Sequence, residues 1–103
     1  MDLSAIIKSI MAVLGPILGD VLKRWLESKL KTAAKGMDDV GTPSGNARQM
    51  LNIALDATPR RQPFRRAFLR HAVESVPGAL AAGKLNSADR KELAALAGVA
   101  DGE

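Results

Sequence analysis

Residues 1–35 read MDLSAIIKSIMAVLGPILGDVLKRWLESKLKTAAK, and this stretch decides the fold class. Its apolar side chains recur at steps of three and four residues, which is the period of an α-helix. The apolar face covers about half of the helix circumference, so a core, a second subunit or a lipid interface has to cover it. We expect that contact to be made by the following side chains: Ile7, Ile10, Leu14, Ile17, Leu18, Val21, Leu22 and Trp25.

A proline interrupts this helical pattern near its middle. Pro16 has no amide hydrogen, so it cannot bond the carbonyl of Ala12, and a helix bends at such a position. We therefore expect one long N-terminal helix, kinked near Pro16. Gly15 and Gly19 also have the spacing of small residues that lets two helix backbones approach closely, although a simple kink explains both glycines.

The rest of the chain predicts a small bundle of three to four helices. Thr42 and Asn86 are helix-capping residues, and proline at the first position of a helix is common. The expected helices and turn are Pro43 to Ala57, Pro63 to Val76 ended by Pro77-Gly78, a short turn at 79–82, and Ser87 to Ala97 stopped by Gly98. The whole chain is then all-α, divided into an N-terminal helix (1–36), a linker (37–42), a compact bundle (43–98) and a frayed tail (99–103).

Composition argues against catalysis. The chain has 103 residues and no cysteine, which excludes disulfides, thiolate zinc sites and cysteine nucleophiles. His71 is the only histidine, and no serine, cysteine or carboxylate stands at a sequence spacing that would form a dyad with it. Asp89 and Glu92 lie one turn apart, but acids are favoured in a first helical turn by the helix dipole alone. We expect no catalytic residue, no metal, no cofactor and no small-molecule substrate.

The formal net charge of +4 is concentrated in two segments, the end of the N-terminal helix and residues 58–76. The second segment supplies the candidate anion contacts Arg60, Arg61, Arg65, Arg66 and Arg70. Arginine suits phosphate because its planar fork donates two hydrogen bonds at once. Three interpretations stay open: a solvated face on which Arg70 pairs with Glu74, a protein or lipid partner, and non-specific binding to a nucleic-acid backbone.

A membrane role is a further alternative. Residues 3–22 supply about 20 mostly apolar positions, the length that crosses a bilayer core, with Lys8 and Asp20 as interruptions. An interfacial helix is also compatible with the pattern. The chain shows no cleavage motif of a secretory signal, so a cytoplasmic or membrane-associated protein is expected.

The sequence therefore predicts a non-enzymatic helical subunit that self-associates, or docks on a partner within a larger assembly, through its N-terminal helix. The alternatives are a membrane-associated protein with an interfacial or spanning N-terminal helix, and a basic helical protein that binds nucleic acid non-specifically.

Overall fold

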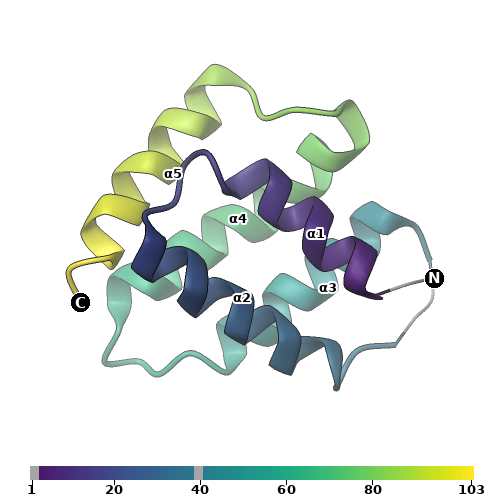
Figure 1. Ribbon diagram of the computed structural model, residues 1–103, viewed down its shortest axis with the longest axis horizontal. Coiled ribbons are helices and arrows are strands. Elements are labelled where there is room, and N and C mark those ends of the chain that lie inside the picture. Colours follow the sequence, from purple (N-terminus) through teal and green to yellow (C-terminus); the bar gives the residue numbers. More distant parts are fainter. Residues whose placement is uncertain (1–2, 39–40) are drawn as a thin grey trace.

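The computed structural model describes residues 3–38 and 41–103, which form helices and no strand (Figure 1). The expected all-α class is confirmed. The helices are α1 (Leu3–Leu14), α2 (Asp20–Ala34), α3 (Pro43–Asp56), α4 (Pro63–Ala82) and α5 (Ser87–Ala100).

The expected long, kinked N-terminal helix has to be corrected, because residues 3–34 form two helices. The amides of Ile17 and Leu18 both donate to the carbonyl of Leu14, at 2.9 and 3.2 Å, and this closes a tight turn around Pro16. Gly19 is extended (φ −77°, ψ 164°), and α2 starts at the next residue. The chain reverses at this turn, so that α2 runs back beside α1 (Figure 1).

A single core draws on every helix. In α1 and α2 the buried apolar residues recur every three or four positions, from Ile6 and Ile10 to Leu26 and Leu30. The helix α4 is central, since it contacts α1, α3 and α5, and its Phe68 is fully buried. The radius of gyration of 12.3 Å is close to the value of about 13 Å expected for a compact chain of this length. Much of the apolar face of α1 and α2 is therefore covered by α3 and α4.

Two expected helix ends are wrong. The helix α4 continues through Pro77 to Ala82, and Gly83, with a φ of 85°, is its left-handed C-cap. The ring of Pro77 is buried, and packing outweighs the one backbone hydrogen bond that proline removes. Similarly, α5 continues through Gly98 to Ala100.

Both expected caps are confirmed. Thr42 Oγ1 accepts a hydrogen bond from the Gly45 amide at 3.0 Å, and Asn86 Oδ1 accepts one from the Asp89 amide at 2.7 Å.

The sequence predicts two irregular segments, the linker (37–42) and the tail (99–103). Residues 39 and 40 of the linker lie outside the described residues. In the segment expected to fray, Val99 and Ala100 belong to α5, and the carboxylate of Glu103 is bonded to the start of α4. Within the described residues, no helix has both the length and the apolarity that a membrane crossing needs.

Candidate functional site

The expected N-terminal contact residues separate into three groups by exposure. Ile10, Leu14 and Leu22 are fully buried in the core of the chain itself, so they offer no surface to a partner. A second group is partly buried and packs against that core: Ile7, Ile17, Leu18 and Trp25. Val21 alone is mainly exposed, at 60%.

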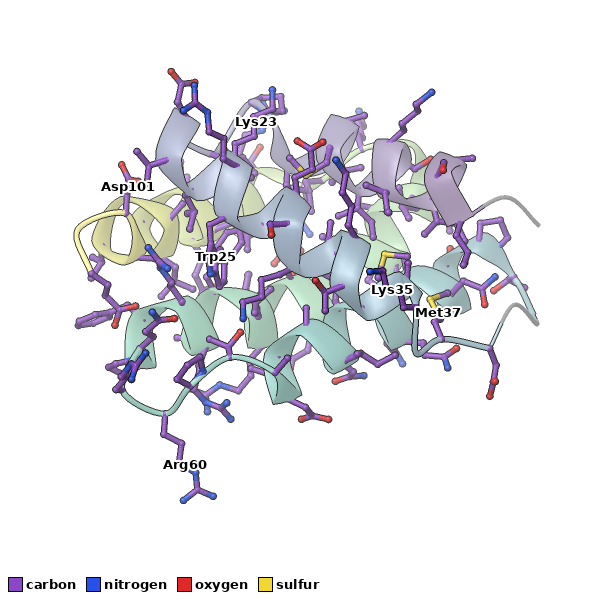
Figure 2. The ribbon with its side chains drawn as sticks, turned by 60° about the horizontal axis from the view of Figure 1, so that its bottom comes forward. Lys23, Trp25, Lys35, Met37, Arg60 and Asp101 are labelled. Carbon is purple, nitrogen blue, oxygen red and sulfur yellow. The ribbon has the colours of Figure 1, made fainter. Side chains whose placement is uncertain are left out.

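Three helix ends meet at one place, which we call the α2–α4–α5 junction. The carboxylate of Glu103 accepts hydrogen bonds from the amides of Phe64 and Arg65, at 3.1 and 3.0 Å, and so satisfies the first turn of α4. The carboxylate of Asp101 lies against Gly19, immediately before α2. Figure 2 shows Trp25 and Asp101 at this end of the molecule.

The large apolar side chains that are exposed in the described residues belong to the three helices of this junction. They are Val21 in α2, Phe64 in α4 and Val99 in α5, at 60%, 47% and 48% exposure. Each lies within a turn or two of the helix end that the junction brings together. Sequence periodicity could identify Val21, but it could not show that Phe64 and Val99 belong to the same region.

Arg65 connects the three helices of the junction. Its guanidinium carbon lies 4.8 Å from the centre of the Trp25 ring, within the range of a cation–π contact. Its Nε donates to the carbonyl of Ala100 at 3.5 Å. Arg65, expected to contact an anion, is therefore engaged inside the fold.

Arg66 has an internal role as well. Its Nη1 donates to the carbonyl of Leu55, in the last turn of α3, at 3.1 Å, and to that of Thr58, just beyond the helix, at 2.7 Å. The last carbonyls of a helix lack helical partners, and Arg66 supplies a donor there. The five arginines thus do not act as one face: Arg65 and Arg66 hold helix ends, whereas Arg60, Arg61 and Arg70 are exposed.

The fold brings the two positive segments of the sequence together. Lys29 Nζ of α2 lies 3.4 Å from the carbonyl of Ala57, at the end of α3, and Arg65 contacts Trp25. Along α2, an open hollow of about 370 Å³ is lined by Arg24, Glu27, Ser28, Lys31, Thr32 and Lys35. We define the basic face as Arg24, Lys31 and Lys35 of α2 with Arg60 and Arg61 of the loop between α3 and α4.

In Figure 2, α2 crosses the front of the molecule, Lys35 lies toward its end and Arg60 extends away from the loop. Lys31 is the one member of the basic face with an ion pair within the described residues, at 3.3 Å from Glu27, and the two side chains are 65% and 44% exposed. Such a surface pair contributes little to stability, so Lys31 can exchange partners easily.

His71 lies beside two carboxylates that the sequence spacing did not reveal. Its Nε2 is 3.6 Å from Asp89 and 3.8 Å from Glu92, across the contact between α4 and α5. Both distances are too long for a hydrogen bond. The imidazole forms ion pairs with these two carboxylates only when it is protonated. No group of three or more metal-ligating side chains occurs in the part of the chain that the structure describes.

In comparisons with known proteins, no protein-family model, no curated protein and no solved structure matches the chain.

Proposed function

We propose that the protein is a non-enzymatic helical assembly subunit that self-associates through the α2–α4–α5 junction. The observation that supports this is the exposure of Val21, Phe64 and Val99 on three helices whose ends meet. Single exposed apolar residues are ordinary on a soluble protein, but apolar side chains gathered in one region favour an interface. Of the contact residues predicted from the sequence of the N-terminal helix, the proposed interface includes Val21 and Trp25.

The size of the junction predicts weak association. Burying one large apolar side chain completely is worth roughly 1.5–3 kcal/mol, so three half-exposed ones give roughly 2–5 kcal/mol per subunit. A two-fold dimer buries the same patch on both subunits, which doubles that gain. Association costs about 4–15 kcal/mol, which nearly cancels it. We therefore expect a dimer at high concentration, or stable association where several contacts act together in a larger assembly.

Sedimentation analysis from micromolar to millimolar concentration tests the proposal. The wild-type average mass should rise with concentration, because the apolar junction becomes buried. The triple variant Val21→Gln, Phe64→Gln and Val99→Gln should remain monomeric.

The matched control substitutes exposed alanines elsewhere, at Ala12, Ala81 and Ala94, by glutamine. The control should associate as the wild type does, and circular dichroism should show that both variants keep their helices. A wild-type chain that is monomeric at every concentration overturns self-association. A triple variant that still associates shows that the junction is not the interface.

A further inference from the structure

We infer that the basic face binds the phosphodiester backbone of nucleic acid. The face is assembled by the fold from two segments that are distant in sequence, α2 and the loop between α3 and α4. The contact of Lys29 with Ala57 and that of Arg65 with Trp25 hold these segments together. The cations of the face therefore come from a helix and a loop that lie side by side.

The cations of this face are mostly uncompensated. Within the described residues, the side chains of Arg24, Lys35, Arg60 and Arg61 make no ion pair and no hydrogen bond, and all four residues are exposed. The acidic residues of the same segments are Asp20 and Glu27 of α2 and Asp56 just before the loop, three carboxylates against the five cations of the face. A surface with this excess of positive charge attracts a polyanion and favours rapid, salt-dependent association.

The spacing along α2 fits a phosphate backbone. Arg24, Lys31 and Lys35 lie on the outward side of the helix, and its rise separates them by about 10 and 6 Å. At about 3.4 Å per nucleotide along one strand, these separations correspond to roughly three and two nucleotides. Phosphate oxygens are bound mainly by arginine, lysine and small hydroxyl side chains, and Ser28 and Thr32 lie between these cations.

The chemistry of the face favours nucleic acid over a lipid surface. A helix that binds a membrane inserts large apolar side chains beside its basic ones. The side chains that line the hollow along α2 include no large apolar residue. The exposed large apolar residues of the described chain belong to the α2–α4–α5 junction, where Asp101 and Glu103 also lie.

Fluorescence anisotropy with a labelled DNA duplex of mixed sequence, measured over a series of salt concentrations, tests the inference. The basic-face variant combines Arg24→Gln, Lys35→Gln, Arg60→Gln and Arg61→Gln. Its affinity at low salt should fall on the order of a hundredfold. The slope of log affinity against log salt should shrink by about 0.9 for each phosphate that the protein no longer neutralises, hence by roughly 3–4 for the four substitutions.

The matched control removes the same charge from exposed positions elsewhere, with Lys8→Gln, Lys84→Gln, Arg90→Gln and Lys91→Gln. Its affinity should fall by less than about threefold, and its salt slope should equal that of the wild type. Equal reductions in the two variants would show that only net charge matters, and would overturn the inference. So would a wild-type chain that does not bind the duplex at low salt.

Vesicles containing phosphatidylserine form the second arm of the experiment. Sedimentation of the wild-type chain with vesicles, together with no binding to the duplex, assigns the face to a membrane and overturns the nucleic-acid inference. The substitutions leave Val21, Phe64 and Val99 unchanged, so failure here leaves the proposed self-association unaffected.

Discussion

Arg65 and Arg66 are neighbours in sequence, yet each holds a different pair of elements together. Arg66 donates to the carbonyls of Leu55 and Thr58 at the end of α3, whereas Arg65 lies over Trp25 of α2. A guanidinium can bind a backbone carbonyl as well as a phosphate, because both are oxygen acceptors. The fate of each arginine therefore depends on which acceptor the fold places within its reach.

Removing the Arg66 side chain should destabilise the protein, because the carbonyl of Leu55 in the last turn of α3 and that of Thr58 just beyond the helix would lose their charged donor. A hydrogen bond to a charged group contributes about 1.5–3 kcal/mol, so we expect Arg66→Ala to lower the free energy of unfolding in urea by about 2–3 kcal/mol. The control is Arg70→Ala, one turn further along α4 at an exposed position, which should stay within about 0.5 kcal/mol of the wild type. Equal effects of the two substitutions would refute the capping role.

At the scale of single helices, two glycines should respond to alanine in opposite directions. A Cβ at Gly78, inside α4, meets nothing within 4 Å, so Gly78→Ala should stabilise the protein by about 0.5–1 kcal/mol. A Cβ at Gly15 lies 2.5 Å from the carbonyl oxygen of Met11, and Gly15→Ala should destabilise the protein by more than that amount. Thermal unfolding measures both, and a lower melting temperature for Gly78→Ala would contradict the geometry of α4.

Helix starts could be predicted from the sequence better than helix ends. Thr42 and Asn86 cap through neighbours three residues away, so their role is local and readable. The two prolines show the limit. Pro16 ends α1 beside Gly15 and ahead of Gly19, whereas Pro77 lies inside α4 with its ring buried. Which outcome follows depends on packing from distant segments, and local propensity does not contain that information.

At the scale of the whole molecule, the two N-terminal helices, α1 and α2, should fold as one unit with α3, α4 and α5. Of the 18 residues that form the core cluster within residues 3–38 and 41–103, α1 and α2 supply Ile6, Ile10, Leu14, Leu22, Leu26, Leu30 and Ala33. Without them, the apolar faces of α3 and α4 are exposed to water. A chain of residues 37–103 should therefore show no cooperative thermal unfolding by circular dichroism. A fragment that keeps a native-like cooperative transition would mean that the bundle is an independent domain.

The width of the apolar face in residues 1–35 showed that it needed a cover, but not which one. A buried core, an oligomer interface and a lipid interface all select large apolar side chains at helical spacing, so this spacing does not distinguish among the three. The contact of α2 with the end of α3 is non-local in the same way. No local sequence pattern around Lys29 or Ala57 predicts that these two residues are in contact. The basic face depends on this contact, so it could not be predicted from the sequence.

Trp25 is the only tryptophan, and the chain contains no tyrosine, so indole emission from this protein has a single source. That source lies under the Arg65 guanidinium, at the place where α2 meets the start of α4. The emission of an indole responds to a charge held against its ring and to the entry of water. The molecule thus carries an intrinsic optical reporter, and the separation or occupation of these helix ends can be followed in real time without a dye.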